Sequence, residues 1–144
     1  MPVLGLALAF AALATSASST APVATTTQSV TMPASQSVED YVRDYFKDAP
    51  IMAEIAHCES RFKQLNADGS VVKNPHSSAV GAFQVMASIH ASTAKNALGL
   101  NIYTLKGNAA YARYLYENEG TAPWNDSKAC WGKSAQALAR ASNK

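Results

Sequence analysis

The sequence predicts a mainly α-helical domain of roughly 100 residues that follows an uncharged N-terminal segment. All 12 Lys and Arg and all 10 Asp and Glu residues lie at or after Glu39. Beyond that point, apolar residues recur three and four positions apart, which is the spacing of one helix face. Glycine or a cluster of Asn, Asp and Gly closes most of these stretches, as is typical of helix C-termini. The folded domain is therefore expected to span residues 37–144.

The N-terminal segment is expected to direct export. Residues 1–14 are apolar but too few to cross a bilayer as a helix, and Thr15-Ser16-Ala17 offers small residues for cleavage, so residues 1–17 are a candidate signal peptide. The usual basic residue near the start is absent, and an uncleaved membrane anchor is the alternative. Residues 18–36 are rich in Ser, Thr, Ala and Pro, which predicts a disordered linker. A secreted, periplasmic or cell-wall-associated protein is expected.

The charged residues argue against nucleic-acid binding. The formal net charge is +2, and positive and negative residues alternate without a long run of Lys or Arg. Weak attraction to an anionic polymer is all that this balance allows.

The first helix is predicted to begin after Ser37. Ser37 suits the N-cap position, and Asp40 supplies an acid at the third helical position. Apolar residues at helical spacing then predict that one face packs on the core: Val38, Tyr41, Val42, Tyr45 and Phe46.

A second helix is expected after Asp48, which suits an N-cap because Pro50 then falls in the first turn. The polar stretch 66–69 is expected to end this segment. Cys58 falls on the apolar face, and Glu59 lies about 100° further round, at the border of that face. A carboxyl group at such a border can be partly desolvated. The apolar face consists of Ile51, Ile55, Cys58 and Phe62.

The rest of the chain is expected to contain a loop and further helices. Residues 63–81 read as irregular, with a small hairpin around Asp68-Gly69-Ser70. Helical patterns return at 87–98, closed by Gly99, at 107–118, closed by Gly120, and in two short pieces at 126–132 and 134–142.

The two cysteines are expected to form one disulfide, Cys58–Cys130, because the chain is predicted to reach an oxidising compartment. A thiol nucleophile paired with His57 is less favoured, since adjacent helical residues point in different directions. A zinc site is disfavoured because no pair of candidate ligands has recognised spacing: His57, Cys58, His76, His90 and Cys130.

Four blocks in order resemble the soluble lytic transglycosylase and goose-type lysozyme group. Glu59-Ser60-Arg61-Phe62 is similar to the group's Glu-Ser-x-Phe motif, and residues 77–84 (SSAVGAFQ) to its Ser-x-Ala-x-Gly motif, which ends in Gln. Residues 108–116 resemble a third helical block, and Pro123-Trp124 with Cys130-Trp131 resembles the end of the disulfide-bearing members. The resemblance covers about residues 50–132 and implies a lysozyme-like fold, with an irregular loop or small hairpin after the catalytic helix.

The resemblance implies that Glu59 is the general acid and base. Cleavage of a glycosidic bond needs a proton on the leaving oxygen, which a carboxyl group with a raised pKa can supply. A surface ion pair with Arg61 or Lys63 is the alternative for Glu59. Asp68 is a candidate second carboxylate, although Asn-Ala-Asp-Gly suits a turn equally well.

The substrate-binding residues that the resemblance implies come from three of these blocks. Two of these residues have a structural alternative, since the glutamine could brace its own loop and the tyrosine could pack in the core. The tryptophan is a candidate for stacking on a sugar because it follows proline. The phenylalanine replaces a commoner methionine. Asn108 is expected to cap its helix. The candidates are Ser77, Phe83, Gln84, Tyr111 and Trp124.

The implied activity is cleavage of the bond between N-acetylmuramic acid and N-acetylglucosamine in peptidoglycan, giving 1,6-anhydro ends. The group's Ala-Tyr-Asn-x-Gly motif is absent, and residues 116–124 read YENEGTAPW, so hydrolysis by the same Glu59 is an alternative. A glycan-binding module without activity is a third hypothesis. A monomer that acts on glycan strands is expected, with no nucleic-acid partner, metal or cofactor.

Overall fold

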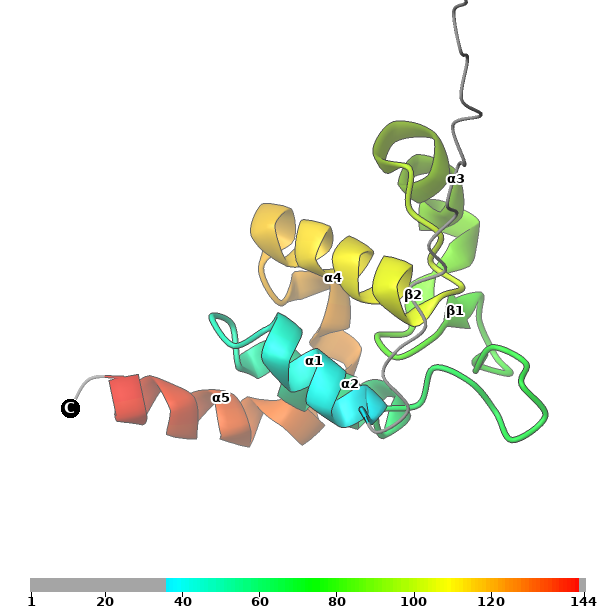
Figure 1. The fold of residues 1–144 in the computed structure, drawn as a ribbon. Helices are drawn as coiled ribbons and strands as arrows, with labels where there is room; N and C mark the ends of the chain where they lie inside the picture. The colour runs from blue at the N-terminus through cyan, green and yellow to red at the C-terminus, as the bar shows by residue number, and fades with distance from the viewer. Residues whose placement is uncertain (1–35, 143–144) are drawn as a thin grey trace, which may run out of the picture. The chain divides into compact units, whose positions relative to one another are not determined.

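A computed structural model describes residues 36–142 and confirms a mainly α-helical protein. The expected signal peptide at 1–17, and the expected linker up to residue 35, lie outside the described residues. No helix within 36–142 is long and apolar enough to cross a membrane. The elements are α1 (Val38–Tyr45), α2 (Ile51–Ser60), β1 (Ala79–Val80), β2 (Val85–Met86), α3 (Ala87–Leu98), α4 (Leu105–Glu119), the 3-10 helix η1 (Ala122–Ser127) and α5 (Lys128–Ser142) (Figure 1).

The core gathers around α1 and α2, which lie between α4 and the start of α5 (Figure 1). Ser37 and Asp40 form the predicted capping box, in which the Ser37 Oγ accepts from the Asp40 N–H at 3.1 Å. Val42 and Phe46 are fully buried, whereas Tyr45 stays exposed. The predicted apolar face of this helix is therefore confirmed at Val42 and Phe46 and not at Tyr45.

The start of α2 differs from the prediction. Pro50, not Asp48, precedes the first helical residue, and the Ala49 and Pro50 carbonyls accept the first backbone bonds. Asp48 instead binds Arg113 of α4, with 2.7 Å between Arg113 Nη2 and Asp48 Oδ1. This pair lowers the pKa of Asp48. The prediction of an Asp48 cap was wrong because a distant guanidinium is the stronger partner for that carboxylate.

The end of α2 also differs from the prediction. The helix stops at Ser60, and Arg61 and Phe62 both adopt left-handed conformations, with φ of 57° and 58°. The chain therefore turns away before Phe62 can continue the apolar face of α2, although its ring is partly buried against the core. Left-handed backbone at two consecutive residues other than glycine is unfavourable, so the surrounding contacts must hold it.

The loop after α2 contains the predicted turn, but the paired strands follow it. The turn at 68–70 is flanked by a single isolated bridge, in which Leu65 pairs with Val71. The two-stranded antiparallel sheet is β1–β2, in which Ala79 pairs with Met86 and Val80 with Val85. Strands of two residues are too short to give a period-two pattern, so the sequence did not reveal them.

The C-terminal part is a 3-10 helix followed by one long helix, where two short helices were predicted. Gly132 lies inside α5 without ending it. α4 begins two residues earlier than expected, and Thr104 rather than Asn108 caps it, since the Thr104 Oγ1 accepts from the Gly107 N–H at 3.1 Å. The predicted disulfide is confirmed: Cys58 of α2 and Cys130 of α5 are joined, with 6.0 Å between their Cα atoms.

Candidate active site

Glu59 lies in the last turn of α2 with its carboxyl group half-buried. The Ser127 Oγ donates to the Glu59 Oε1 at 2.6 Å. Burial raises the pKa of Glu59, the Ser127 hydrogen bond lowers it, and the charge of Asp126 raises it. The alternative ion pair with Arg61 or Lys63 is not found among the described residues. A carboxyl group of this kind is suited to hold a proton and to release it.

Two buried tryptophans hold Ser127 in place. The Trp131 Nε1 donates to the Ser127 Oγ at 3.1 Å and to the Trp124 carbonyl at 3.0 Å. The Trp124 Nε1 in turn donates to the Phe83 carbonyl at 2.9 Å. The partner of Glu59 is therefore fixed by η1 and α5, and η1 is tied to the turn that joins the two strands.

This turn, residues 81–84, is braced by two buried amide side chains. The Gln64 Oε1 accepts from the Ala82 N–H at 3.0 Å, and the Asn108 Oδ1 accepts from the Phe83 N–H at 2.9 Å. A Cβ at Gly81 would lie 2.6 Å from the Asn108 Nδ2, so only glycine allows this approach. Asn108 therefore braces the turn, and its predicted capping role was wrong.

Ser60 joins the turn to the helix that carries Glu59. Its Oγ donates to the Ala82 carbonyl at 2.8 Å and accepts from the Lys63 N–H at 3.0 Å. Within residues 36–142, the residues other than glycine with positive φ lie on the two segments that this contact joins: Arg61, Phe62 and Gln84. Conformations of this type cluster at functional sites, where the surrounding structure holds them in place.

Gln84 closes the turn and is only partly buried. Its Nε2 donates to the Gly81 carbonyl at 2.9 Å, so the amide braces its own loop, the alternative considered from the sequence. The amide carbonyl oxygen has no protein partner among the described residues. Gln84 also lines a pocket of about 210 Å³ together with His90, Glu119 and Trp124. Gln84 therefore stabilises its own turn through its Nε2 and also lines this cavity.

Three of the predicted substrate-binding side chains lie in the core. Phe83 is 0% exposed, Tyr111 1% and Trp124 4%. Phe83 packs between Phe46 and Trp124, and the Tyr111 hydroxyl bonds to the His90 Nδ1 at 3.0 Å. Rings buried to this degree expose little surface for stacking on a sugar, so their burial favours a packing role, and their assignment as substrate-binding residues stays a prediction.

Ser77 and Asp68 lie in the loop between α2 and the sheet. Ser77 is exposed, and its Oγ accepts from the Ala79 N–H at 3.2 Å. No described hydrogen bond joins Ser77 to Glu59. The Asp68 carboxylate accepts from the N–H and Oγ of Ser70, and these bonds lower the pKa of Asp68. Asp68 therefore adopts the turn role that its sequence context allowed.

Ser127, Asp126 and Gln64 were not identified as site residues from the sequence. A signal for Ser127 was present, because it lies three residues after Trp124 and four before Trp131, which places all three on one side of a helical segment. Asp126 and Gln64 are recognised only once η1 and the 81–84 turn are seen in space.

The neighbours of Glu59 should change its proton affinity in opposite directions. We expect Ser127→Ala to raise the pKa of Glu59, because a hydrogen bond that favours the anion is lost. We expect Asp126→Asn to lower it, because a repelling negative charge is removed. An NMR titration of the Glu59 carboxyl carbon measures both shifts. Two shifts of the same sign would contradict this description of the site.

Within residues 36–142, no three His, Cys, Asp or Glu side chains come close enough together to hold a metal ion. The zinc set considered from the sequence is not assembled, because its two cysteines are bonded to each other.

A comparison of the chain with protein-family models, curated proteins and solved structures found no match.

Proposed function

We propose that this protein is an exported, lysozyme-like enzyme that cuts the glycan strands of peptidoglycan, with Glu59 as its general acid and base. The observation that carries the proposal is the half-buried Glu59 carboxyl, whose pKa is raised by desolvation and which is held by Ser127 beside the 81–84 turn. Glycosidases commonly use a carboxyl group with a raised pKa to protonate the leaving oxygen.

The proposed reaction has two steps. Glu59 first donates its proton to the oxygen that links the muramoyl residue to the next sugar, and the C1–O bond breaks while the substrate's own acetamido oxygen bonds to C1. The ionised Glu59 then takes the proton from the C6 hydroxyl of the same muramoyl residue. The C6 oxygen attacks C1 and displaces the acetamido oxygen, which leaves a 1,6-anhydro end. One protein carboxylate serves both steps.

The order of the elements supports a lysozyme-like domain. An acid ends a buried helix, an irregular loop follows, and a short antiparallel hairpin whose turn ends in Gln84 comes next, before the remaining helices. The matching sequence blocks occupy these elements in the same order. The disulfide is compatible with an extracytoplasmic location. A monomeric enzyme that needs no metal or organic cofactor is the form we propose.

Hydrolysis is the second candidate, and Asp126 is the observation that favours it. Its carboxylate acts on Glu59 electrostatically and is exposed, so it could accept a proton from an attacking water. The bond to the leaving sugar would break in the same way, with Glu59 as the acid. Water would then replace the C6 hydroxyl as the nucleophile.

Mass spectrometry of digested peptidoglycan tests the proposal. We expect fragments whose muramoyl ends are one water lighter than hydrolytic products. Borohydride should leave these ends unchanged, because they contain no free aldehyde. Ends that gain two hydrogens on reduction would assign the hydrolytic reaction instead. Binding of the glycan without any cleavage would overturn both and leave a glycan-binding module.

A further inference from the structure

Tyr103 presents an exposed aromatic ring on a rigid support in the connection between α3 and α4. The side chain is 43% exposed, although it is a large hydrophobic residue. Its backbone is fixed at both ends: the Tyr103 N–H donates to the Asn101 Oδ1 at 3.0 Å, and its carbonyl accepts from the Gln64 Nε2 at 3.0 Å. An exposed ring that is held in this way is suited to contact a ligand at little entropic cost.

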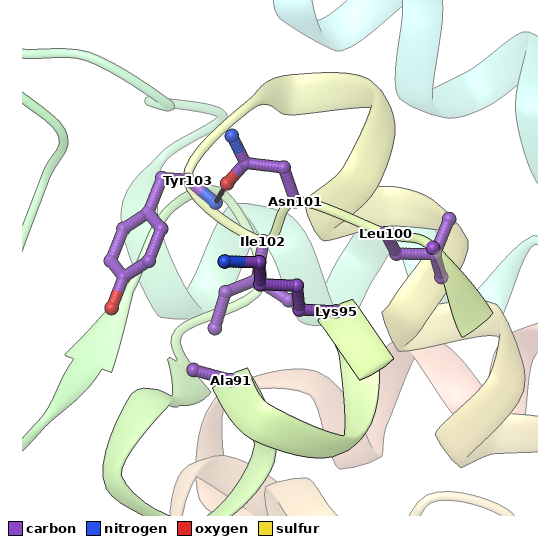
Figure 2. A pocket seen from close by; sticks show the side chains of 7 residues that line it. Ala91, Lys95, Leu100, Asn101, Ile102 and Tyr103 are labelled. Atoms are coloured by element: carbon purple, nitrogen blue, oxygen red, sulfur yellow. Dashed lines mark hydrogen bonds between the residues drawn. The ribbon is translucent and has the colours of Figure 1, made fainter. Parts of the chain in front are cut away.

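Tyr103 lines three cavities, and the largest, of about 690 Å³, has Lys63, Leu65 and Leu105 in its wall. The two smaller cavities contain Lys95 and Lys73. One, of about 480 Å³, lies between α3 and the α3–α4 connection, with Ala91, Leu100 and Ile102 in its wall (Figure 2). The other, of about 200 Å³, has Ser77 and Lys73 in its wall. Tyr103 lines both, so a ligand that crosses the ring could occupy both cavities.

Each of these two smaller cavities, the larger of about 480 Å³ and the smaller of about 200 Å³, contains one lysine and no acid. Lys95 lines the larger cavity, and its side chain extends across it toward Tyr103 (Figure 2). Lys73 lines the smaller cavity. Neither lysine forms an ion pair with a carboxylate of the residues that the structure describes. The surface formed by Lys73, Tyr103 and Lys95 thus combines two unpaired cations with an exposed aromatic residue.

Gln64 connects this surface to the candidate active site. Its Nε2 holds the Tyr103 carbonyl, and its Oε1 holds the Ala82 N–H in the 81–84 turn. The side chain is 4% exposed, so it is a fixed link between the two. A ligand bound at the Tyr103 surface would therefore have a defined position relative to that turn.

We propose that the Lys73–Tyr103–Lys95 surface binds the carboxylates of the short peptides attached to the glycan strand. The inference rests on the proposed function, which supplies a substrate that bears such peptides. Their free carboxylates suit the two lysines, and their alanyl methyl groups suit the ring and the aliphatic wall of the larger cavity. The enzyme would then prefer glycan that carries peptides to bare glycan.

Binding measurements with the Glu59→Gln protein test this proposal, because they need no cleavage. Calorimetry would compare soluble glycan strands that carry peptides with the same strands after an amidase has removed them. We expect Lys73→Gln with Lys95→Gln to weaken binding of the peptide-bearing strands by about 10-fold, and not to affect the bare strands. Tyr103→Ala should likewise weaken only the former.

The matched control is Lys47→Gln with Lys133→Gln, which removes the same charge from two exposed lysines that line neither cavity. An equal loss of affinity in this control would show that net charge alone explains the weaker binding, and it would overturn the proposal. So would equal affinity of the unmodified surface for peptide-bearing and bare strands, or tighter binding of a glycerol-phosphate polymer than of peptide-bearing strands. Cleavage by the native protein is scored separately, so failure of the enzyme proposal is distinguishable from failure of this one.

Discussion

Replacing Glu59 with glutamine is expected to reduce the release of glycan fragments by about 10²- to 10⁴-fold, which is the typical contribution of general acid–base catalysis. Glutamine has nearly the shape of glutamate and can still bond to Ser127, but it has no proton to donate to a leaving oxygen. The measurement is the rate at which soluble fragments appear from purified peptidoglycan.

Glu54→Gln is the matched control for this change. Glu54 lies on the same helix, and its replacement removes the same charge. Its carboxylate pairs with Arg43 at 3.3 Å rather than with Ser127. We expect this variant to keep the native rate. Equal loss of activity in the two variants would show that α2 is merely sensitive to charge, and full activity of Glu59→Gln would remove Glu59 from the mechanism.

Thermal stability of Glu59→Gln separates an effect on catalysis from an effect on folding. The pKa of Glu59 is raised by burial, so the folded state binds its proton more tightly than the unfolded state does. The contribution of this group to stability is therefore greatest at low pH and declines as the pH rises through the folded-state value. At neutral pH, Glu59→Gln should be at least as heat-stable as the native protein although its rate of glycan cleavage is strongly reduced.

Removal of the disulfide by Cys58→Ala with Cys130→Ala is expected to lower the stability by about 4 kcal/mol, from the entropy of a closed loop of this length. The two residues are 72 positions apart. For a domain of this size such a loss corresponds to a fall in Tm of about 18 °C. Thermal unfolding of the native and double-variant proteins, followed by circular dichroism, measures the effect.

The disulfide is also expected to affect activity through geometry. Cys58 directly precedes Glu59, and Ser127 lies three residues before Cys130, so the bond joins the two segments that make the 2.6 Å contact between Ser127 and Glu59. At a temperature at which the double variant is folded, we expect its rate to be lower than native. Full activity at that temperature would show that the bond serves stability alone.

The helical content, the Ser37 cap and the disulfide were predictable because each depends on residues close in sequence or on a simple count. The capping box needs only Ser37 and Asp40, and two cysteines in an exported chain have one simple pairing. These features follow from local chemistry that tertiary contacts did not alter.

The role of Asp48 could not be predicted, because it is decided by Arg113, which lies 65 residues further along the chain. The same holds for Asn108, whose amide accepts from the Phe83 N–H and donates to the Val80 and Ile102 carbonyls, and does not cap its own helix. For a polar residue near a helix start, capping is the favoured local interpretation, but a buried backbone group elsewhere can be the better partner.

The burial of the predicted aromatic ligands has a similar origin. An aromatic residue at helical spacing suits both a core and a sugar-binding surface, and only the packing of Phe83 against Phe46 and Trp124 decides between them. Among the described residues, the exposed rings include Tyr103, which lies in a connection between helices that gave no periodic signal. Glu59 was identified because it lies in a recognised motif. Its partner Ser127 was missed because its contact with Glu59 depends on where η1 lies in space.

The central claim is that Glu59 holds a proton more tightly than an ordinary glutamate and donates it during glycan cleavage. A ¹³C NMR titration of the Glu59 carboxyl carbon in the native protein tests this most directly, with Glu59→Gln to assign the signal. The account predicts a pKa above the ordinary value of 4.5 that coincides with the alkaline decline of kcat/KM on peptidoglycan. A pKa at or below 4.5, or an alkaline decline unrelated to it, would contradict the account.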